Sequence, residues 1–149
     1  SSNSGGAIYI HGNANVTINN ATISSNTVTS SGGAIYLNNT ATLTINDSTI
    51  SGNTAYRGGA IYINSTGATL ITGSTLADNT ATNRSGLVES YPGSTLEFIG
   101  STLIDKDASN GSFMYLRKPL YCLKYWSMSW LASLRLMSSC LLILVAPAP

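Results

Sequence analysis

The sequence contains few charged residues. Lys, Arg, Asp and Glu make up 9% of its 149 residues, whereas soluble domains average about 25%. The formal net charge is +1, and a nucleic-acid-binding surface requires clustered positive charge. We therefore expect no nucleic-acid partner.

Cysteine and histidine are also scarce. Cys122 and Cys140 are the only cysteines and His11 is the only histidine. This excludes a disulfide framework and the paired spacings of zinc sites. We predict no metal site and no cofactor, and we interpret His11 as a turn residue.

A repeated phrase is the main feature that the sequence does contain. Gly-Gly-Ala-Ile-Tyr begins at Gly5, returns at Gly32 after 27 residues and again at Gly58 after 26. A degraded fourth copy begins at Ser85. Self-similarity at this period is typical of solenoids.

Each repeat contains three short runs of alternating apolar and polar residues, which indicate strands. Gly, Asn, Asp and Ser separate the runs and favour turns. A repeat of about 27 residues has no room for a helix as well. We therefore predict an all-β fold, a right-handed single-stranded parallel β-helix of about four coils, in which each strand pairs with its copy in the next coil.

The alternation also predicts which residues face the core. Aliphatic and aromatic residues recur in register in each of the three runs, and β-branched residues pack well on their own copies. The predicted core columns are Ile8, Ile35, Ile61 and Val88; Ile18, Ile45, Ile71 and Phe98; and Ile23, Ile50, Leu76 and Leu103, with Ile10, Leu37 and Ile63 beside the first.

Two polar columns are candidate structural or binding sites. Asn26, Asn53 and Asn79 recur in register, and their stacked amides would form a hydrogen-bonded ladder; turn propensity alone is the alternative. Tyr9, Tyr36 and Tyr62 alternate with the inward residues. We predict that these tyrosines face outward as one stripe, either as a sugar-binding surface or as stacked neighbours.

The composition changes near residue 108. In the Asn column the fourth position is Lys106, and residues 111–149 contain no Asn, Thr, Asp, Glu, Gln or His. We therefore predict two parts, the β-helix repeats of residues 1–108 and a Leu- and Ser-rich tail of residues 109–149. Three interpretations of the tail stay open: a membrane anchor, a cap on the solenoid end, and aberrant sequence from a shifted reading frame.

The repeats resemble those of the chlamydial polymorphic outer membrane proteins. That family combines Gly-Gly-Ala-Ile with a Phe-x-x-Asn motif, and the matching stretches here are Ile23–Asn26, Ile50–Asn53 and Leu76–Asn79. Ile or Leu replaces the family's Phe. The resemblance covers about residues 1–104. It implies export to the cell surface or outer membrane and an adhesin-like role.

Function is less well determined than fold. The chain contains six carboxylates, Asp47, Asp78, Glu89, Glu97, Asp105 and Asp107, and they do not form the acidic cluster that polysaccharide-cleaving β-helix enzymes need. We predict no catalytic residues and interpret the chain as a fragment of an exported adhesin-like protein. The alternative is a non-catalytic part of a pectate-lyase-like, polysaccharide-active enzyme.

The resemblance and composition also suggest partners. We expect a carbohydrate or host-surface ligand, and the open ends of a short stack favour end-to-end self-association. If the tail is an anchor, it would add membrane association.

Overall fold

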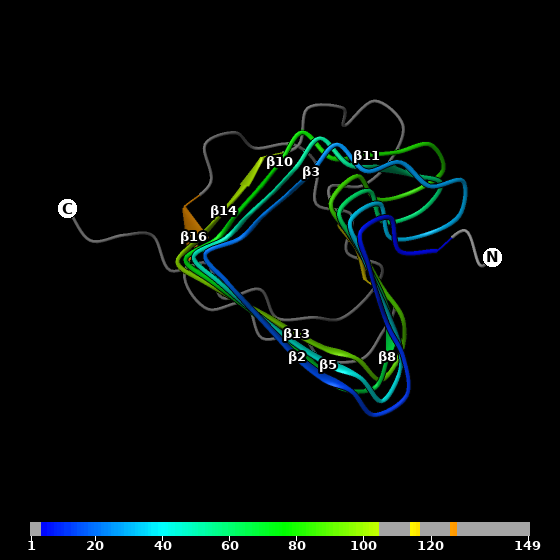
Figure 1. Cartoon of the computed structure of the whole chain (residues 1–149), viewed down its shortest axis with the longest axis vertical. Coiled ribbons are helices and arrows are strands. Elements are labelled where there is room, and N and C mark those ends of the chain that lie inside the picture. Colours follow the sequence, from blue (N-terminus) through cyan, green and yellow to red (C-terminus); the bar gives the residue numbers. More distant parts are fainter. Residues whose placement is uncertain (1–3, 105–113, 117–125, 128–149) are drawn as a thin grey trace.

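The computed structural model describes residues 4–104, 114–116 and 126–127. Within these residues the regular secondary structure consists of strands alone. The strands form three parallel sheets that run along a stack of coils, so the prediction of an all-β parallel solenoid of about four coils is confirmed. Figure 1 looks nearly along the stack, and the coils overlie one another around a triangular interior.

The first sheet contains the Gly-Gly-Ala-Ile-Tyr strands. Its order is β1-β4-β8-β12-β15, and its strands are β1 (Ile8–Ile10), β4 (Ile35–Asn39), β8 (Ile61–Ser65), β12 (Val88–Ser90) and β15 (Met114–Leu116).

The second sheet forms the side at the bottom of Figure 1. Its order is β13-β9-β5-β2, with β2 (Asn15–Asn19), β5 (Thr42–Asn46), β9 (Ala68–Thr72) and β13 (Thr95–Ile99).

The third sheet has the order β16-β14-β10-β6-β3. Its strands are β3 (Thr22–Ser24), β6 (Thr49–Ser51), β10 (Thr75–Ala77), β14 (Ser101–Ile104) and β16 (Trp126–Ser127). A fourth sheet, which the sequence did not predict, contains only two strands, β7 (Thr54–Ala55) and β11 (Thr80–Ala81). These strands directly follow Asn53 and Asn79.

The strand register confirms the predicted columns. Ile35 pairs with Ile8 and Ile61 in the first sheet, and Ile45 pairs with Ile18 and Ile71 in the second. In the third, Ile50 lies between Ile23 and Leu76. Because the side-chain period of a strand is two residues, one register places all members of a column on the same side of the sheet.

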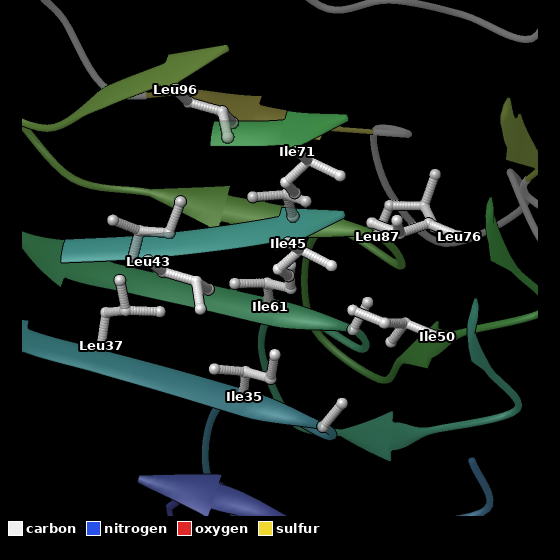
Figure 2. Close-up of a cluster of buried hydrophobic side chains, with 14 of the residues drawn as sticks. Ile35, Leu37, Leu43, Ile45, Ile50, Ile61, Ile71, Leu76, Leu87 and Leu96 are labelled. Carbon is white, nitrogen blue, oxygen red and sulfur yellow. The ribbon is translucent and has the colours of Figure 1, made fainter. Parts of the chain in front are cut away.

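The core is one continuous apolar cluster along the coil axis. Figure 2 shows Leu37, Ile45, Ile61 and Ile71 pointing into the space between the sheets. Phe98 lies in the same cluster and is fully buried. In the first coil Ile10 is buried, but Ile8, Val16, Ile18 and Ile23 are only partly buried, since no strand of the described residues lies beyond β1, β2 and β3.

Paired glycines form the corner that precedes each strand of the first sheet. Gly32 has φ of 72°, a conformation that favours glycine. A Cβ built on Gly33 would lie 2.0 Å from the carbonyl oxygen of Gly59 in the next coil. The repeated glycine pair is therefore explained by two needs, a left-handed turn and a close approach of backbones.

Two strands lie beyond residue 108, where the regular repeats were expected to end. Met114 pairs with Val88 and its side chain is buried in the core cluster, and Trp126–Ser127 pairs with β14. Met114 continues the aliphatic column, which is why a strand with no Gly-Gly-Ala-Ile phrase can still join the stack. The remainder of the predicted tail lies outside the described residues, and so does Lys106.

Candidate functional site

The outward face of the first sheet contains the predicted tyrosine stripe and forms the candidate site. Tyr36 pairs with Tyr9 and Tyr62 in the strand register. The ring centroids are 5.2 Å apart between Tyr9 and Tyr36 and 5.0 Å between Tyr36 and Tyr62. The structure therefore brings the three predicted residues together as one stack.

Exposure changes along this stack. The side chain of Tyr9 is 45% exposed, but that of Tyr62 is only 6% exposed. Tyr62 therefore lies on the predicted outward face but is not open to a ligand. The reason lies in its neighbours: Tyr91 packs on its ring with the centroids 5.4 Å apart, and Arg57 donates to the Tyr91 hydroxyl oxygen.

The ring faces are also turned toward one another. The planes of Tyr9 and Tyr36 differ by 26°, those of Tyr36 and Tyr62 by 20°, and His11 stacks against Tyr9 at 13°. Offset stacking of this kind uses the apolar ring faces for mutual contact. Ring edges and hydroxyl groups are then what the stripe offers to a ligand.

A second outward column lies beside the tyrosines. Two residues after each tyrosine position come His11, Asn38, Asn64 and Tyr91. Asn64 Nδ2 donates to Asn38 Oδ1 at 3.0 Å, and Asn38 Nδ2 donates to the hydroxyl oxygen of Tyr9 at 3.4 Å. This column follows the same period as the tyrosines, but its three residue types, His, Asn and Tyr, hide the repeat in the sequence.

His11 follows β1 directly before the turn at Gly12 and Asn13, and its side chain joins this column. Its Nδ1 lies 3.4 Å from Asn38 Nδ2 and 3.5 Å from the Tyr9 hydroxyl, and its Nε2 lies 3.5 Å from Asn39 Nδ2. Tyr9, His11, Asn38 and Asn64 are all partly or well exposed. Together they form a patch of hydrogen-bond donors and acceptors, which we call the amide patch.

Charged residues lie at the end of this sheet face that is opposite Tyr9. Arg57 and Arg84 are the two basic residues of the described part of the chain, and they occupy neighbouring coils just before the glycine corner. Arg84 forms an ion pair with Glu89 at 3.3 Å, and Glu89 is 0% exposed. Arg57 donates to the hydroxyl oxygen of Tyr91 at 3.2 Å.

This packing shifts the acidity of the tyrosines. Burial raises the pKa of Tyr62 well above its ordinary value, and the hydrogen bond with Tyr91 raises it further. Burial also raises the pKa of Tyr36, against the opposing effect of a hydrogen bond from Asn64. The shift delays ionisation at alkaline pH; at neutral pH both phenols are protonated, as an ordinary tyrosine is, and can donate hydrogen bonds.

The predicted asparagine column lies at a different corner and faces the interior. Asn26 Nδ2 donates to Asn53 Oδ1 and Asn53 Nδ2 donates to Asn79 Oδ1, both at 2.9 Å. The backbone N–H groups of Asn26 and Asn53 donate to the same oxygens at 3.0 Å. This amide ladder satisfies turn backbone groups of the stack. The three residues lie together, with Asn53 and Asn79 buried and Asn26 partly buried.

A buried serine ladder at a third corner was not foreseen. The backbone N–H of Ser48 donates to Ser74 Oγ at 3.1 Å, and that of Ser74 donates to Ser101 Oγ at 3.2 Å. Their recurrence at the repeat period was visible in the sequence. Serine is too common in turns to single them out without the structure.

The carboxylates of the described residues occupy separate places. Asp47 and Asp78 are exposed turn residues with positive φ, Glu97 lies in β13, and Glu89 is buried in its ion pair. Asp105 and Asp107 lie outside the described residues. Across the part of the chain that the structure covers, no three His, Cys, Asp or Glu side chains gather as metal ligands, and no helix is long and apolar enough to cross a membrane.

Comparison with known proteins gives one match. A family model described as a right handed beta helix region matches residues 1–118. This range includes all four coils and β15, and it extends past the boundary predicted at residue 108. No curated protein and no solved structure matches the chain.

Proposed function

The chain belongs to the right-handed β-helix family, and from this premise we propose that it is a structural and binding module whose amide patch recognises a carbohydrate. The observation that carries the proposal is the row of exposed amide, imidazole and phenol groups on one flat sheet face. A sugar offers both donors and acceptors through its hydroxyl groups, and an amide side chain offers both as well.

The register of the solenoid supports an extended ligand. Asn38 and Asn64 lie in paired positions of adjacent strands, which are about 4.8 Å apart in a sheet. A linear glycan lying along the stack would therefore meet His11, Asn38 and Asn64 in successive coils. Because the ring faces are occupied by their neighbours, recognition would depend on hydrogen bonds with the amide patch more than on sugar–ring stacking.

The proposal assigns no catalysis to this face. Glu89 is the one carboxylate in the two outward columns, and it is buried against Arg84. A general acid or base must reach the substrate within hydrogen-bonding distance, and this carboxylate is engaged elsewhere. We therefore propose binding and display as the role of the module, without enzyme activity.

Binding can be tested with the full chain on an array of neutral and acidic oligosaccharides. We expect Asn38→Ala combined with His11→Ala to lower binding at least tenfold, since both substitutions remove hydrogen-bonding groups from the amide patch. The matched control is Asn19→Ala combined with Asn46→Ala, an exposed amide pair on the second sheet joined at 2.8 Å. Equal binding by both variants, or no bound oligosaccharide at all, would overturn the proposal.

We extend the proposal to an exported, adhesin-like protein at the cell surface, as the resemblance to polymorphic outer membrane proteins implies. Abundant uncharged polar residues on the outward faces suit a surface that meets water and glycans rather than nucleic acid. Brief trypsin treatment of intact source cells should release peptides such as residues 58–84, which cleavage after Arg57 and Arg84 produces. Recovery of those peptides only after lysis would contradict the surface location.

A further inference from the structure

The described repeats contain no cysteine, so no disulfide can join one of these coils to the next. They contain instead a stack of tyrosines that crosses the coils. Tyr9 lies in the first coil and Tyr36 in the second, and their ring centroids are 5.2 Å apart at an interplanar angle of 26°. Rings at this distance and angle are in direct contact.

We propose that Tyr9 and Tyr36 are an oxidative cross-linking site, at which a one-electron oxidant forms a dityrosine bond between successive coils. Each phenol loses one electron and one proton, and the two tyrosyl radicals couple through the ring carbons next to their hydroxyl groups. The hydrogen on each newly bonded carbon then moves to the oxygen of the same ring, which restores both aromatic rings and both hydroxyl groups. With hydrogen peroxide as the terminal oxidant, the two electrons and two protons reduce one peroxide to two waters.

Exposure selects this pair within the stack. Tyr9 is 45% exposed and Tyr36 is half-buried, so an oxidant reaches Tyr9 directly. Tyr62 is 6% exposed, and Tyr91 packs on its ring with the centroids 5.4 Å apart. The outer end of the stack is therefore the reactive end. This inference does not depend on carbohydrate binding.

The chain offers a matched control for reactivity. Tyr56 is 46% exposed, almost the same as Tyr9, but its ring contact is with the guanidinium of Arg57 at 5.7 Å. If exposure alone governed the reaction, Tyr56 would cross-link as readily as Tyr9. If contact between stacked rings is required, removal of the Tyr56 hydroxyl leaves the yield of dityrosine unchanged.

The test treats the full chain at low concentration with peroxidase and hydrogen peroxide, and then cleaves it with trypsin and an Asp-specific protease. Cleavage before Asp47 separates residues 1–46, which contain Tyr9 and Tyr36, from residues 47–57, which contain Tyr56. We expect the 1–46 peptide to lose two hydrogen atoms and to gain dityrosine fluorescence. Tyr9→Phe keeps the stacked ring and should abolish this product, whereas Tyr56→Phe should leave it unchanged.

Three results would overturn the proposal. The first is a 1–46 peptide of unaltered mass after oxidation, and the second is a product joined only between two chains. The third is an equal yield of the cross-linked peptide from chain unfolded in guanidinium chloride, because that product would then form without stacked rings.

Discussion

At the residue scale, the same repeated position serves different purposes in different coils. The outward tyrosine position is exposed at Tyr9, half-buried at Tyr36 and buried at Tyr62. In the fourth coil it is occupied by Glu89, which pairs with Arg84. A repeat therefore fixes where a side chain points, but its neighbours decide whether solvent or a ligand can reach it.

The inner glycine of each corner gives the first prediction at this scale. Gly33→Ala should destabilise the chain by at least about 2 kcal/mol, because the new Cβ would meet the backbone of the next coil at Gly59. Gly12→Ala is the control. Gly12 has φ of 75° with no atom within 4 Å of its Cβ position, so only backbone strain of about 1 kcal/mol is expected.

Denaturant unfolding of the two glycine variants would measure this difference. Equal losses of stability would show that conformational freedom, and not the close approach of coils, explains the glycine at position 33.

At the scale of elements, the corners depend on columns of small polar side chains as much as on apolar packing. The asparagine ladder closes the turn between the third sheet and β7, and the serine ladder closes the turn between the second and third sheets. Each ladder satisfies backbone groups that a buried turn would otherwise leave unpaired. The strands are held in register by these columns together with the core.

Removal of the central amide tests the ladder. Asn53 is fully buried; its Nδ2 donates to Asn79 Oδ1 and to two backbone carbonyls, and its Oδ1 accepts from Asn26. We expect Asn53→Ala to lower the free energy of unfolding by about 3 kcal/mol, since several buried groups lose their partners. Asn46→Ala, in the exposed amide pair, should cost less than about 0.5 kcal/mol. Thermal or denaturant unfolding of both variants provides the measurement, and similar losses would contradict the ladder's role.

At the scale of the whole molecule, the stack is uneven from end to end. Core residues of the second and third coils are fully buried, but Ile8, Val16, Ile18 and Ile23 of the first coil are partly exposed. Among the described residues, β1, β2 and β3 each have a neighbour on one side only. Such an edge combines unpaired backbone groups with apolar side chains and favours pairing with another chain.

We therefore predict concentration-dependent self-association through this edge. Ile18→Lys places a charge on the inward side of β2 and should lower association at least tenfold, because an inward charge blocks edge pairing. Thr17→Lys adds the same charge on the outward side of that strand and is the control. Sedimentation velocity of both variants, with circular dichroism to monitor folding, provides the test. Equal association by the two variants would place the contact elsewhere.

The architecture could be predicted from the sequence alone, because every coil of a solenoid has the same local pattern and packs on its own copy. Glycine pairs, alternating strands and in-register aliphatic residues such as Ile35 and Ile61 specify strand pairing with the next copy, without any long-range information. The columns of Tyr36 and Asn53 followed from the same period. Sequence could not show that Met114 continues the stack, since no repeated phrase precedes it.

Tertiary structure decided what each column is available to do. Only packing reveals that Arg57 and Tyr91 bury Tyr62, that Tyr9 and Tyr36 turn their faces to each other, and that His11 joins Asn38 and Asn64. The cover on Tyr62 comes from neighbouring columns, whereas the other contacts join successive coils of one column. Periodicity shows which positions are neighbours, but burial, ring orientation and hydrogen bonding depend on what lies beside each column as well as along it.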